Sequence, residues 1–269
     1  MFTAKFWAGA AYFLLALPLF YYSHTVALPL VMTGIAMRCV YEAFHISGFY
    51  ESKLLMVPAL CLPPLLCFAP YFGHGLWALF CYAWLLLALL LYLLHYDNST
   101  LLQFVYCAFF TLLLSAGISI PVQTRQLEGG QWLIIFTFAG CWAADTCAQM
   151  CGRMFGKHKL GIGVSPNKTI EGCVGSLICT AAVYGLLGFA INRLAGTTFR
   201  IPLLVLSGFA VSLAAQVGDL LASAVKRCFG VKDFSRLIPG HGGMYDRFDS
   251  FALVAPMVYL MADLLPLFA

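Results

Sequence analysis

Charged residues are scarce in this chain: Asp, Glu, Lys and Arg make up 10% of its 269 residues, whereas 62% are hydrophobic. Soluble domains usually contain about 25% charged residues, so this composition excludes an ordinary soluble protein. The chain also lacks the segments of about ten residues with alternating hydrophobicity that are typical of membrane barrels. Its apolar runs are long and continuous, which predicts an all-α integral membrane protein.

Several familiar site motifs are missing as well. The 11 cysteines form no C-x-x-C pair, which argues against the common zinc and dithiol motifs, and most of them lie within apolar runs as packing residues would. The sequence contains no Walker A, DFG or G-x-S-x-G motif. It therefore gives no sign of a P-loop, protein-kinase or serine-hydrolase site.

The apolar runs predict about nine transmembrane helices of roughly 17 to 21 residues each. Because short cytoplasmic loops retain Lys and Arg, the distribution of these residues orients the bundle. A cytoplasmic N-terminus places all but three of the 15 Lys and Arg residues on or near the cytoplasmic side, and an external C-terminus follows. The net charge of +4 then reflects this bias and not a nucleic-acid partner. The expected spans are 6–22, 25–44, 54–72, 75–94, 101–120, 131–151, 172–191, 201–221 and 250–267.

Polar chemistry is unevenly distributed along the chain. Region 1–125 is interpreted as membrane-anchoring helices, and its only notable polar pair, Glu42 and His45, is expected to be structural or interfacial. Region 126–269 is interpreted as a catalytic membrane domain with two cytoplasmic polar loops, 152–171 and 222–249.

The first polar feature is Asp145, which lies roughly 10 Å inside the span expected at 131–151. A carboxylate at that depth costs on the order of 3 kcal/mol unless it faces a wet cavity or a partner. We interpret Asp145 as part of a polar cavity wall; a buried hydrogen bond between helices is the alternative.

The loop 152–171 places cations between glycines and ends in Asn167-Lys168-Thr169 before the next apolar run. Such a segment suits an anion, because glycine lets the backbone approach and a helix N-terminus offers free N–H groups. An ordinary N-cap at Ser165 or Thr169 is the alternative.

In the span expected at 201–221, a polar stripe continues beyond the apolar run. Gln216, Asp219, Ser223, Lys226 and Arg227 occupy one side of a helix. A carboxylate inside the membrane with cations just outside it suits a metal ion that holds a polyphosphate. A ladder of intrahelical ion pairs with snorkelling cations is the alternative.

A glycine-rich turn, His241-Gly242-Gly243, follows and can wrap closely around a ligand. Asp246 and Asp249 then lie three residues apart on one helical face. Carboxylates, glycine N–H groups and cations together match what Mg²⁺-dependent phosphoryl or nucleotidyl transfer requires. His241 by itself could equally be a hydrogen-bonding turn residue.

The run S-x-V-K-R-x4-K-D-x-S-x2-I-P-G-H-G-G-M-x-D-R-F-D, from Ser223 to Asp249, resembles the signature of the phosphatidate cytidylyltransferase (CDP-diacylglycerol synthase) family. The segments Asp145–Leu160 and Ser165–Gly172 resemble the same family in the same order. The resemblance implies a homodimeric enzyme of the bacterial inner membrane with its active site facing the cytoplasm. It would condense CTP with phosphatidic acid to CDP-diacylglycerol and pyrophosphate in phospholipid synthesis, with Mg²⁺ as cofactor and the identity of any second cation left open.

With that family as a guide, roles can be assigned to the polar residues. Asp219, Asp246 and Asp249 are expected to bind Mg²⁺ and, with Lys226, to form the catalytic set. Lys226, Arg227 and Arg247 are expected to clamp phosphates. The residues expected to bind substrate are Asp145, Asn167, Lys168, Thr169, Ser223, Arg227, His241, Gly242, Gly243 and Arg247.

Two other classes of function remain open from the sequence. A CTP-dependent lipid kinase, or a cytidylyltransferase for another lipid anion, would use the same metal and basic loops. An anion transporter fits less well, because transporters more often have broken helices near the midplane or repeated halves, whereas the polar residues here gather at one face.

Overall fold

The structure is a computed structural model, and it describes residues 22–47, 53–73, 75–94, 100–161, 163–237 and 242–268. Helices account for nearly all regular structure in these ranges. The only β-pairing among the described residues is two isolated bridges, Lys159 with Thr169 and Phe199 with Phe268. The helices are α2 (Ala27–Ser47), α3 (Lys53–Phe72), α4 (Leu76–Leu94), α5 (Leu101–Thr124), α6 (Gly130–Phe155), α7 (Ile170–Ala195), α8 (Ile201–Cys228), α9 (Tyr245–Phe248) and α10 (Phe251–Leu264).

The described part of the chain contains seven helices that are long and apolar enough to cross a membrane, namely α2 to α8. The prediction of an all-α multi-pass membrane protein is confirmed at this level. Most large side chains of α4 point outward, and Trp84 and Ala88 are its buried residues. An apolar helix that is exposed nearly all round suits contact with lipid.

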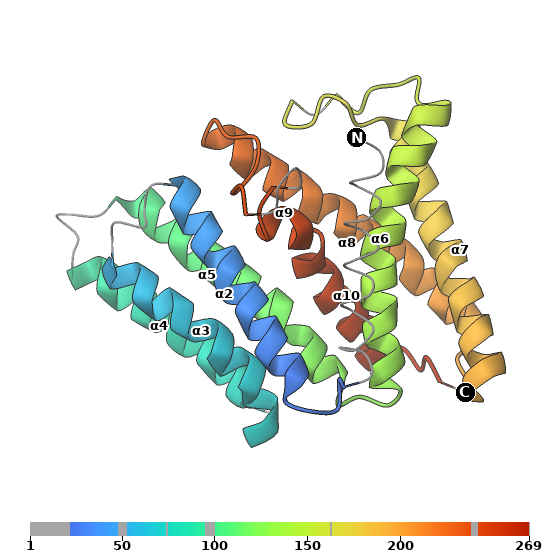
Figure 1. Cartoon of the computed structure of the whole chain (residues 1–269), viewed down its shortest axis with the longest axis horizontal. Coiled ribbons are helices and arrows are strands. Elements are labelled where there is room, and N and C mark those ends of the chain that lie inside the picture. The colour runs from blue at the N-terminus through green and yellow to red at the C-terminus, as the bar shows by residue number, and fades with distance from the viewer. Residues whose placement is uncertain are drawn as a thin grey trace.

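The helices form two groups joined by α10 (Figure 1). Helices α2 to α5 pack together on one side and α6 to α8 on the other, while α10 contacts α5, α6 and α8. Glycines allow the close contacts: a Cβ added at Gly117 of α5 would overlap the carbonyl oxygen of Ala252 of α10. Small residues at such crossings are typical of membrane helices, because they let two backbones approach.

Several helices run beyond the apolar segments that predict them. Helix α8 continues to Cys228, so Lys226 and Arg227 lie on its last turn. It ends at a left-handed glycine, Gly230, with φ of 66°, a common way for a helix to stop. The polar stripe predicted on this segment is therefore continuous helix.

One end of the nine-span prediction differs from the structure, and the other stays a prediction. The span expected at 6–22 lies outside the described residues except for Tyr22. The span expected at 250–267 is a 14-residue helix, α10, which is about 21 Å long and shorter than the roughly 30 Å hydrocarbon core. It is shorter because the chain leaves the helix after Leu264 and runs extended, so that the carbonyl of Leu267 accepts a hydrogen bond from the N–H of Arg200 at 2.8 Å.

Candidate functional site

An ion pair joins the first polar loop to the polar stripe of α8. Lys168 Nζ lies 2.5 Å from Asp219 Oδ2, and both side chains are partly exposed. The loop is held in place by the Lys159–Thr169 bridge and by the N–H of Leu160, which donates to the carbonyl of Lys168 at 2.9 Å. This contact brings the first polar loop and the polar stripe of α8 together.

The start of α7 shows why Lys168 lies where it does. Thr169 is the N-cap of α7, and its Oγ1 accepts a hydrogen bond from the N–H of Gly172 at 3.1 Å. Thr169 is 8% exposed, so the structure favours the N-cap alternative for it. Its contact with substrate stays a prediction. Asn167 is exposed next to it.

Asp249 lies close to Asp219 because α8 has a glycine at the crossing. A Cβ added at Gly218 would lie 2.7 Å from the carbonyl oxygen of Asp249 and 2.9 Å from Cα of Ser250. The Asp249 carboxylate accepts a hydrogen bond from the N–H of Ser250 at 2.7 Å. Burial, reinforced by the negative charges of Asp219 and Asp145, raises the pKa of Asp249 to about 8. Three of the predicted acids therefore lie near enough to repel one another.

Asp246 has a different environment, since donors from the chain itself occupy both of its oxygens. Oδ1 accepts from Lys226 Nζ at 2.8 Å, and Oδ2 accepts from the N–H groups of Phe234 at 2.8 Å and Gly243 at 2.9 Å. The side chains of Lys226 and Asp246 are 14% and 5% exposed. Asp246 thus orients Lys226 in this structure, whereas the sequence predicts a metal ligand.

Part of the predicted phosphate-binding turn is bonded to carboxylates of the chain. Gly242 has φ of 80°, a left-handed conformation that favours glycine. The N–H groups of Gly243, Met244 and Tyr245 donate to the carboxylates of Asp246 and Glu42 and are not free for a phosphate. His241 lies outside the described residues, so its part in the turn stays a prediction.

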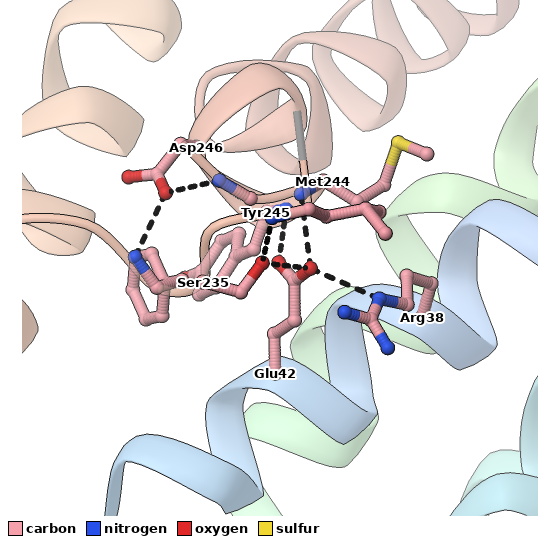
Figure 2. A network of polar contacts seen from close by, with 9 residues as sticks. Arg38, Glu42, Ser235, Met244, Tyr245 and Asp246 are labelled. Carbon is pink, nitrogen blue, oxygen red and sulfur yellow. Dashed lines mark hydrogen bonds and ion pairs between the residues drawn. The ribbon is translucent and has the colours of Figure 1, made fainter. Parts of the chain in front are cut away.

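Glu42 of α2 makes polar contacts with distant segments that sequence reasoning missed (Figure 2). Its carboxylate is 1% exposed and accepts hydrogen bonds from Ser235 Oγ at 2.8 Å and from the N–H groups of Met244 and Tyr245 at 3.1 and 2.9 Å. Arg38 Nε donates to the same carboxylate at 3.0 Å. The structural role expected for Glu42 agrees with this burial and bonding. Arg38 belongs to the same helix, but the other three partners lie 193, 202 and 203 positions further along the chain. The available signal was a lone acid inside an apolar run.

The remaining predicted residues lie around these carboxylates. Ser223 is half-buried on α8, and Arg227 and Arg247 are exposed at its end and in α9. Asp145 lies on α6 near enough to Asp249 to influence its ionisation. These positions leave the expected clamps at the surface of the site, where an anion could reach them.

The residues present fit a divalent cation only in part. Within the described ranges, no three His, Cys, Asp or Glu side chains are arranged to hold a metal ion. The repulsion among Asp145, Asp219 and Asp249 nevertheless favours a cation, and Mg²⁺ is commonly held by one or two carboxylates together with substrate phosphates. The donors therefore fit an ion whose coordination substrate completes, and not a cage made of protein alone.

Fold and site together define a helical membrane protein that collects lysines and carboxylates from separate segments at one end of the bundle. The chain belongs to the cytidylyltransferase family, because that family's model matches residues 4–265. It is similar to a protein named phosphatidate cytidylyltransferase from Staphylococcus haemolyticus, with 42% identity over 145 residues, 54% of each chain. Proteins with the same name from Staphylococcus saprophyticus and Staphylococcus aureus are each 38% identical, and the match covers 61% of each chain. The matched part thus spans between 54% and 61% of these relatives.

Proposed function

We propose that this protein is a phosphatidate cytidylyltransferase, which condenses CTP with phosphatidic acid to CDP-diacylglycerol and pyrophosphate. The observation that carries the proposal is the Lys168–Asp219 ion pair, which brings the first polar loop onto α8 beside Asp249. Relatives with that name support the choice of substrates.

The reaction joins two anions, so charge compensation is its main requirement. A phosphate oxygen of phosphatidic acid, already ionised at neutral pH, attacks the α-phosphorus of CTP. The bond between that phosphorus and the bridging oxygen breaks, and pyrophosphate leaves. Lys168 and Lys226 provide fixed positive charge near the reacting phosphates, and Arg227 and Arg247 provide it at the surface of the site.

For the cofactor we propose Mg²⁺, with Asp219 and Asp249 as the ligands that fit best and Asp246 as the weaker candidate. Bound Mg²⁺ would neutralise and align phosphate groups. Asp246 is the weaker candidate because it is already bonded to Lys226 and to two N–H groups. Homodimerisation also belongs to this proposal, because the family resemblance implies it.

We further propose that the protein lies in the bacterial inner membrane with the site facing the cytoplasm. The positive-inside bias supports this orientation. Tags inserted in 153–161 or at 230–237 should be accessible only from the cytoplasmic side, and a C-terminal tag only from outside. Accessibility of the two loops from opposite faces would contradict both the orientation and the single composite site.

Arg227 provides a test of phosphate clamping. A planar guanidinium can hold two phosphate oxygens at once, whereas an ammonium cannot. Arg227→Lys should therefore raise the apparent KM for one substrate by about tenfold. Lys232→Arg, a charge-conserving change at an exposed loop residue, is the matched control and should leave both KM values unchanged. Wild-type kinetics for Arg227→Lys would remove Arg227 from the clamp.

The proposed activity itself is tested with the purified protein in detergent, given radiolabelled CTP and phosphatidic acid in the presence of Mg²⁺. The expected products are CDP-lipid and pyrophosphate. CDP together with a phosphorylated lipid would identify a lipid kinase instead. No turnover with any lipid anion would overturn the proposed function and favour transport.

A further inference from the structure

A buried acid of α2 holds the polar segment that ends at the site. We call residues 233–237 and 242–246 the strap. Glu42 is the only acidic residue of α2, and its two oxygens accept four donors, three of them from the strap. A carboxylate buried to this degree is costly without partners, so the three donors from the strap fix where the strap lies.

The packing around Glu42 is tight as well as polar. Gly243 is buried, and a Cβ added there would overlap Glu42 Oε2 and lie 2.8 Å from Ser235 Oγ. Both arms of the strap, Ser235 on one and Met244 and Tyr245 on the other, meet on this single carboxylate (Figure 2). Glu42 therefore ties the two arms together.

A second carboxylate continues the connection to α8. Asp246 also bonds both arms, through the N–H groups of Phe234 and Gly243, and its other oxygen holds Lys226 Nζ. The N–H groups of Gly243, Met244 and Tyr245 are consecutive and are divided between the two carboxylates. A displacement at Glu42 must therefore shift the N–H groups that orient Asp246, and with them Lys226.

We propose that Glu42 is a positioning residue: through the strap it fixes Asp246, and so the ammonium group of Lys226, in the site. This rests on the proposed function for its effect on turnover. Glu42 acts through the strap and not on substrate. The N-terminal helices thus take part in building the site, beyond anchoring it.

Limited proteolysis tests the hold on the strap without reference to activity. Arg236 is exposed in the strap and Lys232 is exposed beside it. Lys157 and Lys159 are exposed in the other loop and serve as an internal control. In the detergent-solubilised protein, Glu42→Gln should accelerate tryptic cleavage after Arg236 by about tenfold, because an amide places N–H donors against N–H donors. Cleavage after Lys157 and Lys159 should be unchanged.

Kinetics then separate positioning from simple stabilisation. Per folded molecule, Glu42→Gln should lower kcat by about tenfold or more, with both KM values within about threefold, and Glu42→Asp should restore part of the loss. Glu128→Gln, the same change at an exposed carboxylate, is the matched control. If Glu42→Gln does not fold, Ser235→Ala removes one donor and should show the same pattern, reduced to about threefold.

The outcomes are distinct. Equal cleavage after Arg236 in wild type and variant would overturn the hold on the strap, and faster cleavage at both loops would mean general loosening and overturn it too. A loosened strap with unchanged kcat in an enzyme that makes CDP-lipid would overturn the positioning role. A wild-type protein that makes no CDP-lipid would instead overturn the proposed function and the role in turnover, while proteolysis would still decide whether Glu42 holds the strap.

Discussion

Replacing Asp219 with asparagine is expected to cut turnover at least about 100-fold, which corresponds to roughly 3 kcal/mol of transition-state stabilisation. Asp219 pairs with Lys168 and adds to the negative field at Asp249. The amide removes the charge of a proposed cation ligand and the ion-pair partner of Lys168 in one step. Steady-state rates of CDP-lipid formation with CTP and phosphatidic acid measure the loss.

The control for this change is Asp263→Asn, the same substitution at an exposed acid near the end of α10. It should leave the rate unchanged. Asp219→Asn should also shift the Mg²⁺ concentration needed for half-maximal rate upward if Asp219 is a ligand. Near-wild-type turnover and Mg²⁺ dependence in a folded variant would exclude Asp219 from the metal site.

The second large effect is expected at Lys226, whose removal leaves the nearly buried Asp246 without its cation. Breaking a buried ion pair on one side usually costs about 3–5 kcal/mol, because an uncompensated charge remains. Lys226→Met should therefore lower the midpoint of thermal unfolding in detergent as well as abolish CDP-lipid formation. Both readouts are needed, since instability alone would also reduce activity.

A double variant separates these two effects. Lys226→Met combined with Asp246→Asn removes both charges, so most of the lost stability should return while activity stays absent. Recovery of activity in the double variant would contradict a role for Lys226 in charge compensation. No recovery of stability would show that the ion pair is not what the single variant lost.

Local sequence patterns predicted much of the molecule correctly. Long apolar runs require helices in a bilayer, so the helical class and most helix positions followed from composition. The stripe from Asp219 to Lys226 followed from helical periodicity, and it lies on continuous helix as expected. The ion pair of Lys168 with Asp219 was not predicted as a contact, although both residues were expected at the same site.

The parts that sequence reasoning missed depend on contacts between distant segments. Glu42 meets Tyr245 across 203 positions of the chain, and no local pattern indicates such a pair. The glycine turn was interpreted as an anion-binding loop because glycine lets the backbone approach a ligand, but in the fold the N–H groups of Gly243 and Met244 donate to carboxylates of the chain. The length of α10 was overestimated because hydropathy does not predict the hydrogen bond of the extended segment after it, from the N–H of Arg200 to the carbonyl of Leu267.

The separation along the sequence between Glu42 and its partners in the strap has a consequence for synthesis in the cell. At about 5–20 residues per second, the ribosome needs roughly ten seconds or more to proceed from Glu42 to Tyr245. During that interval α2 must exist with a carboxylate in its apolar surface and with no strap to receive it. Arg38, one helical turn away and 3.0 Å from the carboxylate, is the partner already present on the nascent helix. We expect Arg38 to pair with the Glu42 carboxylate until the last segment of the chain has been synthesised.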